Sequence, residues 1–197
     1  MSVVDLFLNY LSRSSVVTIA VLVWLSLYFL VTFWIILYRY LYLNSLIKRE
    51  EGSLEAMLMG STTVRPDSIL RKCTSQYRGS STVFDICINV AEKNATSYLS
   101  TLSVISSTSP FIGLFGTVVG ILETFSKLSG ATTASLNIIA PAISEALVAT
   151  AGGILVAVPA YSGYIILKRK AYEYLSIIER EKSLLVNNLE NEIDTKT

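Results

Sequence analysis

The sequence predicts an all-α integral membrane protein with three transmembrane helices. Of its 197 residues, 52% are hydrophobic and only 16% are charged, and the mean hydropathy is +0.54. Charge-free stretches separate Arg13 from Arg39 and Lys93 from Glu123, and a third long apolar stretch holds one charge, Glu145. A bilayer span needs about 20 mostly apolar residues, so these three stretches accommodate three spans.

These stretches and the polar regions between them predict seven consecutive segments. In order they are an outer N-terminal segment (1–15), transmembrane helix 1 (16–38), a cytoplasmic helical segment (39–103), transmembrane helix 2 (104–125), an outer loop (126–137), transmembrane helix 3 (138–167) and a cytoplasmic C-terminal helix (168–197). The first span is longer than the apolar region of a secretory signal and lacks a following small-residue cleavage site. It is therefore expected to stay in the mature chain.

The helices are expected to extend beyond the bilayer. Helix 1 continues past Arg39 and ends near Gly52 or Gly60. From Thr82, apolar residues recur every three or four positions, and no turn signal separates this pattern from the second span. One uninterrupted helix is therefore expected to start in the cytoplasm and run through the membrane. The C-terminal helix has an apolar stripe that includes Ile178, with its charged residues expected in solvent.

The distribution of basic residues predicts the orientation. With Arg13 and Lys127 on one side, the other 14 of the 16 Lys and Arg residues fall on the opposite side. The positive-inside rule then places the N-terminus in the periplasm and the C-terminus in the cytoplasm of a multi-pass inner-membrane protein in contact with lipid. Cys73 and Cys87 fall on the cytoplasmic side, where reduced thiols are expected.

The composition excludes several kinds of function. The chain has no histidine, which removes imidazole catalysis, Ser-His and Cys-His pairs and most transition-metal sites. The net charge of +1 gives no indication of a nucleic-acid partner. We therefore expect no enzymatic activity, no catalytic residues, no cofactor and no metal.

Small residues recur at helical spacing in the second and third spans and predict close helix packing. Without a hydrophobic drive between helices in lipid, small residues allow the backbones to approach. The glycines of span 2 are not a phosphate loop, because no lysine follows and no strand precedes them. The predicted packing residues are Gly113, Gly116 and Gly120 in span 2 and Ala142, Ala146 and Gly153 in span 3.

Glu145 differs in kind from its small neighbours. A charged carboxylate at mid-membrane costs at least about 2.5 kcal/mol. No Lys or Arg lies within the three predicted spans to neutralise it. Two interpretations remain open: a protonated Glu that ties helices together, or a carboxylate that lines a pathway for ions. Counting residues along the helices places Thr117 and Thr150 at comparable depths, so these three residues could form a shared polar zone.

Two motifs in these spans closely resemble the paired signature of the ExbB/TolQ family, which is more distantly related to the MotA stator subunits. They are "PFIGLFGTVVGI" and "IAPAISEALVATAGGILVAVPA", in the family's order and with a similar interval. The resemblance is strong over residues 109–161 and only architectural elsewhere. By this resemblance, Thr117 and Thr150 match pore-facing threonines of the family and Glu145 matches its intramembrane glutamate.

The resemblance implies a homopentamer in the inner membrane of Gram-negative bacteria. Such a ring encloses the single transmembrane helices of two ExbD- or TolR-like subunits. Proton flow is thought to drive its rotation, and the work passes to a TonB-like protein for substrate import or to a TolA-like protein for envelope integrity. Val119, Glu123 and a short cytoplasmic segment depart from the pattern of many relatives. The choice between a TonB-type and a Tol-type role therefore stays open.

Two functions of other classes compete with the motor. One is a non-conducting membrane scaffold in which Glu145 is structural, and the other is a small proton-coupled transporter that acts alone. A scaffold should tolerate Glu145→Gln, whereas a charge-dependent motor should stall. A transporter should move its substrate in liposomes that contain only this chain.

Overall fold

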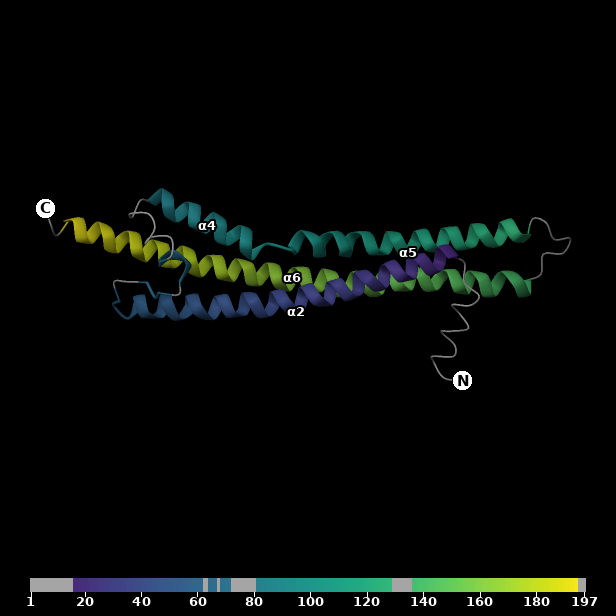
Figure 1. Cartoon of the computed structure of the whole chain (residues 1–197), viewed down its shortest axis with the longest axis horizontal. Helices are drawn as coiled ribbons and strands as arrows, with labels where there is room; N and C mark the ends of the chain where they lie inside the picture. Colours follow the sequence, from purple (N-terminus) through teal and green to yellow (C-terminus); the bar gives the residue numbers. More distant parts are fainter. Residues whose placement is uncertain (1–15, 62–63, 67, 72–80, 129–135, 195–197) are drawn as a thin grey trace. The chain divides into compact units, whose positions relative to one another are not determined.

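The computed structural model describes residues 16–61, 64–66, 68–71, 81–128 and 136–194, and the described part is helical without strands. The helices are α2 (Val16–Leu58), α4 (Ser81–Ala95), α5 (Leu99–Leu128) and α6 (Leu136–Asp194) (Figure 1). Three helical stretches among these residues are long and apolar enough to span a membrane. The all-α class predicted from the sequence is therefore confirmed.

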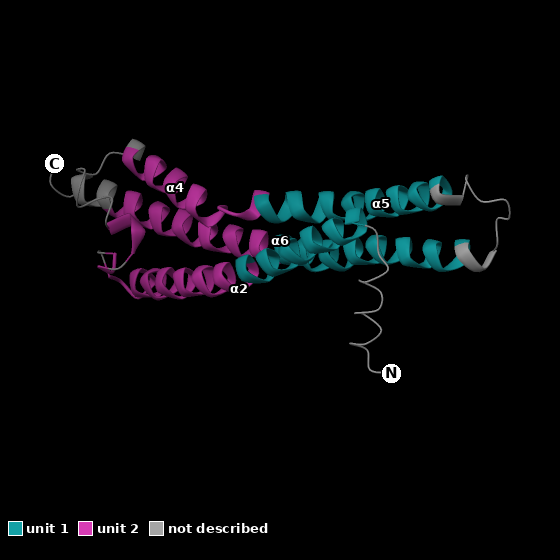
Figure 2. Ribbon diagram, turned by 45° about the vertical axis from the view of Figure 1, so that its right-hand side comes forward, with its two compact units in different colours: residues 1–35, 101–164 teal, residues 36–100, 165–197 magenta. Residues whose placement is uncertain are grey.

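The chain forms two compact units, which α2 and α6 both enter (Figure 2). Unit 1 comprises residues 1–35 and 101–164, and unit 2 comprises residues 36–100 and 165–197. Unit 1 thus contains most of the three predicted spans, and unit 2 contains most of the predicted cytoplasmic segments.

Unit 1 has a thin core of small and branched side chains where α2, α5 and α6 meet. Its buried members are Val21, Leu25, Ile105, Ala149, Val156 and Ala160. Large apolar side chains cover its outside instead: Trp34 of α2 is 74% exposed and Phe111 of α5 is 71% exposed. A surface of this kind suits lipid or neighbouring helices rather than water.

Unit 2 has a conventional water-excluding core between α2, α4 and α6. The apolar pattern predicted from Thr82 onward is buried, with Phe84 1% exposed and Ala91 fully buried. Tyr174 and Ile178 of α6 and Leu43 of α2 are also buried. The hydrophobic effect therefore stabilises this unit in the ordinary way.

The expectation of one uninterrupted helix from the cytoplasm through span 2 is wrong. α4 ends at Ala95 and α5 begins at Leu99, with a turn between them. Tyr98 has a φ of 67°, which is uncommon for a residue with a side chain. The hydroxyls of Thr96 and Ser97 donate to the carbonyls of Glu92 and Asn94, at 2.8 and 3.0 Å. Such bonds compete with the regular helical pattern.

Arg39 of α2 explains why the chain breaks at this point. Its guanidinium donates to the carbonyl oxygens of Asn94 and Ala95, at 2.6 and 2.8 Å, and the residue is only 5% exposed. These carbonyls belong to the last turn of α4, where no intrahelical donor remains. The guanidinium also lies 5.1 Å from the ring centroid of Tyr42 and 5.9 Å from that of Tyr98. A buried cation thus caps α4 at its negative end.

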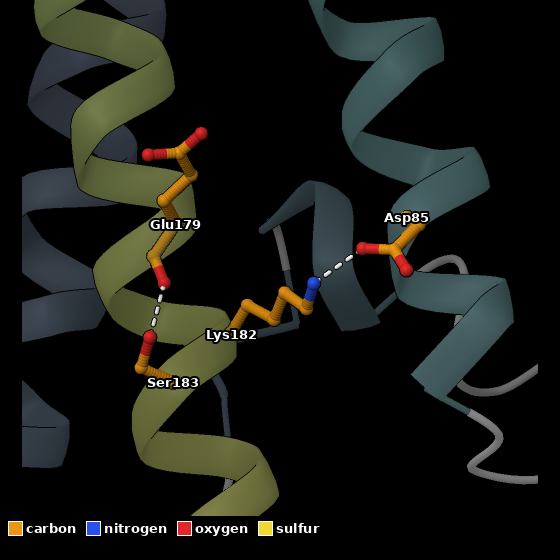
Figure 3. Close-up of polar contacts among 4 residues, drawn as sticks. All are labelled: Asp85, Glu179, Lys182 and Ser183. Carbon is orange, nitrogen blue, oxygen red and sulfur yellow. Dashed lines mark hydrogen bonds and ion pairs between the residues drawn. The ribbon is translucent and has the colours of Figure 1, made fainter.

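A second contact joins α4 to α6 nearer the surface. Lys182 of α6 forms an ion pair with Asp85 of α4, while Ser183 donates to the backbone carbonyl of Glu179 (Figure 3). These residues line a surface cavity of about 500 Å³. Because Asp85 is 59% exposed, the pair contributes at most about 1 kcal/mol.

Cys87 corrects the expectation of reduced thiols. It is 7% exposed and disulfide-bonded, and Cys73 lies outside the described residues. The expectation considered only the redox conditions of the predicted compartment, which carry no information on which sulfurs the fold brings together.

Replacing Arg39 by Met should destabilise unit 2, because a buried and a partly buried carbonyl lose a charged donor. We expect a loss of about 2 to 4 kcal/mol in the free energy of unfolding, measured in detergent, and faster hydrogen exchange in the last turn of α4. Lys93→Met is the matched control, since Lys93 lies in the same turn but is exposed. Equal stability of the two variants would contradict this role for Arg39.

Candidate functional site

α5 and α6 approach each other most closely in unit 1, where both carry glycine. A Cβ atom placed on Gly113 would lie 2.6 Å from the carbonyl oxygen of Ala149. One placed on Gly153 would lie 2.6 Å from the carbonyl oxygen of Ser109. Real Cβ atoms do not come this close to backbone oxygens. The two backbones are therefore in direct contact, and only glycine fits at either position.

The contact continues along both helices and becomes looser by degrees. A Cβ on Gly116 would lie 3.0 Å from the Cβ of Ala149, and one on Gly120 would lie 3.3 Å from the Cβ of Ala146. Ala146 is 2% exposed and Ala149 is fully buried. The small side chains of the two helices thus fit into each other, and dispersion contacts hold the pair together.

This close approach brings two threonine hydroxyls into contact. The Oγ1 atoms of Thr117 on α5 and Thr150 on α6 form a short hydrogen bond in which either can donate. The Thr117 hydroxyl also lies 3.1 Å from the carbonyl oxygen of Ala146 and 3.2 Å from that of Gly113. The Thr150 hydroxyl lies 3.4 Å from the Gly113 carbonyl oxygen. Thr117 is 8% exposed and Thr150 is partly buried.

The hydroxyl pair has fewer protons than acceptors. Its two O–H groups face each other and two backbone carbonyls, so each proton has more than one acceptor within reach. Two hydrogen-bonding arrangements are possible. In one, Thr117 donates to Thr150 and Thr150 donates to the Gly113 carbonyl; in the other, Thr150 donates to Thr117 and Thr117 donates to a carbonyl. A network of this kind can reverse its direction by rotating hydroxyls, without breaking the helix packing.

Glu145 lies on α6 beside this contact surface. It is partly buried, and it directly precedes Ala146, whose carbonyl receives the Thr117 hydroxyl. It is five residues from Thr150, which corresponds to about 7.5 Å along a helix. Ala142, the remaining predicted packing residue, is partly buried one turn from Ala146. The three polar residues singled out from the sequence therefore lie within a short length of the two helices.

The described residues suggest no metal centre. Nowhere in the described ranges do three or more His, Cys, Asp or Glu side chains gather in a way that could hold a metal ion. The chemistry available at this site is that of hydroxyls, backbone carbonyls and a single carboxylate.

Comparison with known proteins bears on this arrangement. The model of the MotA/TolQ/ExbB proton channel family matches residues 70–180, which is more than half of the chain and includes Thr117, Glu145 and Thr150. The chain belongs to this family. It is thus a multi-pass, all-helical membrane protein of a proton channel family, as the resemblance of its motifs indicated.

Individual members of the family align over different lengths. The protein named biopolymer transport protein ExbB-like 1, from Helicobacter pylori strain 26695, is 43% identical over 183 residues, covering 92% of this chain and 97% of its own. The Tol-Pal system protein TolQ of Haemophilus influenzae is 41% identical over 87 residues, covering 44% of this chain and 38% of its own. The biopolymer transport protein ExbB of Pseudomonas putida is 43% identical over 82 residues, covering 42% and 25%.

The sequence analysis missed the residues of α2 that pack beside the contact between α5 and α6. Span 1 offered no obvious polar site, yet Thr18 is 3% exposed and Thr32 is fully buried. Thr18 lies near Gly120, and Val21 contacts Gly116. The signal was present, because Thr18, Val21, Leu25 and Thr32 are spaced by three, four and seven residues and share one helix face. Ala149 was also missed, although it lies between Gly113 and Gly116 of α5.

Gly153→Ala should force α5 and α6 apart, because the new methyl group would meet a backbone oxygen that cannot move alone. We expect a loss of about 1 to 3 kcal/mol in the free energy of unfolding, followed by titration with a denaturing detergent. Gly152→Ala is the matched control, since its methyl group would meet only Leu25 and Leu22, at 3.6 and 3.7 Å. The idea fails if the two variants are equally stable.

Proposed function

We propose that this chain is a motor subunit driven by the proton-motive force. Five copies form a ring in the inner membrane, with the N-terminus in the periplasm and the C-terminus in the cytoplasm. The ring surrounds the transmembrane helices of two ExbD- or TolR-like subunits and passes work to a TonB- or TolA-like protein. The observation that carries the proposal is the hydroxyl contact between Thr117 and Thr150 beside Glu145, in a member of a proton channel family.

The physical argument starts from what lies next to the hydroxyl pair. Glu145 and Thr150 are only partly buried by their own chain, although they lie within an apolar span. A carboxylate left against lipid is costly, so another protein surface or water must complete its surroundings. A ring of copies around partner helices would supply both. The exposed apolar side chains of unit 1, such as Trp34 and Phe111, would then face lipid or neighbouring copies.

The choice between a TonB-like and a TolA-like partner rests on the relative with the ExbB-like name, which matches over nearly its whole length. The matches to ExbB of Pseudomonas putida and to TolQ cover 25% and 38% of those proteins and do not separate the two. We accordingly propose energised import across the outer membrane as the output.

Replacing either threonine of the hydroxyl pair by valine should slow transport without unfolding the chain. Thr117→Val and Thr150→Val keep the shape of the side chain and remove one O–H group each. If the hydroxyl bond is used when the barrier is crossed, losing about 1.5 kcal/mol slows transport about tenfold. The measurement is energy-dependent siderophore uptake in cells that depend on this chain, with detergent sensitivity as the readout for the Tol-type alternative.

Three further variants make the test specific. Thr150→Ser should restore uptake, because it returns the hydroxyl. Thr108→Val should leave uptake unchanged, since the Thr108 hydroxyl bonds to the Val104 carbonyl of its own helix at 2.7 Å. Glu145→Gln should stall a charge-dependent motor. Full uptake by Glu145→Gln would instead favour a scaffold, and substrate transport by the chain alone in liposomes would favour an independent transporter.

A further inference from the structure

Two carboxyl side chains meet in the interior of unit 2, one from α2 and one from α6. Glu50 is 2% exposed, Glu181 is fully buried, and the two are within hydrogen-bonding range of each other. They lie about 12 and 14 residues beyond the predicted spans, which is roughly 20 Å of helix. They are therefore desolvated by protein and not by lipid.

Each carboxyl has one oxygen with a donor and one without. The Ile69 amide donates to Oε1 of Glu50 at 3.1 Å, and the Ser68 hydroxyl donates to Oε2 of Glu181 at 3.2 Å. The buried Oε2 of Glu50 and Oε1 of Glu181 have no donor among the described residues. Two ionised carboxylates can only accept, so they would repel each other here. A single proton on either one supplies the missing donor for both.

The described side chains of α2 and α6 around the pair include a hydroxyl and phenols. On α2, Ser53 is fully buried and its hydroxyl lies against Glu181. On α6, burial raises the pKa of Tyr174, and the neighbouring Glu50 adds to the effect, so the phenol stays neutral. Tyr42 of α2 is a further phenol near Tyr174.

In the described part of the segment between α2 and α4, the basic residues are Arg65 and Arg71, and both are exposed. The guanidinium of Arg71 donates to the carbonyl oxygen of Val64 at 3.0 Å. That of Arg65 lies against the backbone of Gly52.

Burial is the largest cause that raises the pKa of Glu181, to about 7, and the charge of Glu50 adds to it. The hydroxyls of Ser53 and Ser68 oppose the shift.

We propose that Glu50 and Glu181 form a proton-binding site in unit 2, in which one shared proton fixes the segment carrying Ser68 and Ile69 to α2 and α6. With the proton bound, an O–H of one carboxyl donates to the other. When the proton leaves to solvent, two adjacent carboxylates remain, and one must turn toward water. That movement breaks a bond to Ile69 or Ser68. The site rests on its own geometry and does not depend on the proposed motor function.

The direction of the pH dependence follows from the raised pKa. The docked segment holds its proton up to about pH 7, whereas a carboxyl released to solvent loses it near 4.5. Docking is therefore strongest below pH 4.5, weakens as the pH rises toward 7 and is constant above that value. For one proton, the equilibrium constant for opening rises about tenfold per pH unit within this window.

Hydrogen exchange of the Ile69 amide measures this opening directly. The full-length chain in detergent is examined from pH 5 to pH 8, with rates corrected for the intrinsic pH dependence of exchange. We expect the opening constant to rise about tenfold per unit to pH 7 and then level off. A wild-type minus Glu181→Gln infrared difference spectrum should contain a protonated-carboxyl band at pH 6 that disappears by pH 8.

Amide variants test the shared proton. In Glu181→Gln, and separately in Glu50→Gln, the new N–H donor replaces the proton permanently, so Ile69 should stay protected at pH 8. Glu179→Gln is the matched control, because Glu179 is exposed two residues from Glu181, and it should keep the wild-type pH profile.

Three results would overturn the proposal. The first is an Ile69 opening constant in wild type that does not change with pH. The second is a pH slope that persists in either amide variant. The third is restored protection at pH 8 on adding Na⁺ or Ca²⁺ alone, since the site would then bind a metal cation instead of a proton. If one amide variant does not fold, the other variant and the wild-type profile still decide the question.

Discussion

The contact between the backbones of α5 and α6 is the constraint on which unit 1 depends. Gly113 and Gly153 face the opposite backbone so closely that neither position admits a Cβ atom. In lipid the hydrophobic effect does not hold helices together, so this contact must stabilise the pair through dispersion and hydrogen bonds. The same closeness places the Thr117 hydroxyl against the Thr150 hydroxyl. Packing and the candidate site are therefore one feature of the structure.

The two units satisfy their buried polar groups in different ways. In unit 1 the buried polar residues carry hydroxyls, and that of Ser109, for example, bonds to the carbonyl four residues back in its own helix. Burying such a hydroxyl costs little free energy in any surroundings, because its acceptor belongs to the same helix. The buried hydroxyl of Thr32 has no partner among the described residues. In unit 2 the buried polar residues include Arg39, Glu50 and Glu181, which need partners from other parts of the chain. A partner on another part of the chain can move away, whereas a carbonyl four residues back in the same helix cannot. Unit 2 is thus better suited to respond to conditions in solution.

The sequence predicted the features that depend on local pattern. Long apolar stretches, glycine spacing and the two threonines are each visible within a few turns of helix, and they led to the helices and to the contact between α5 and α6. The break after Ala95 was not predictable in this way. It depends on Arg39, which is more than 50 residues away in the sequence and takes the final carbonyls of α4. The bond between Ser68 and Glu181 spans still more of the chain.

Glu145 and Glu181 show that the charges near an acid in the sequence do not predict how deeply the fold buries it. Glu145 stands alone in an apolar stretch, yet its own chain buries it only in part. Glu181 lies in a charge-rich helix that suggested solvent, yet it is fully buried. The folded chain itself disfavours the ionised form of Glu181, because α2 and the segment after it exclude water from the carboxyl. Glu145 is exposed in part, so whatever covers α6 in the membrane contributes to the free energy of its ionised form. An acid of the second kind can change its environment when an assembly moves, which is the property that an ion-driven motor requires.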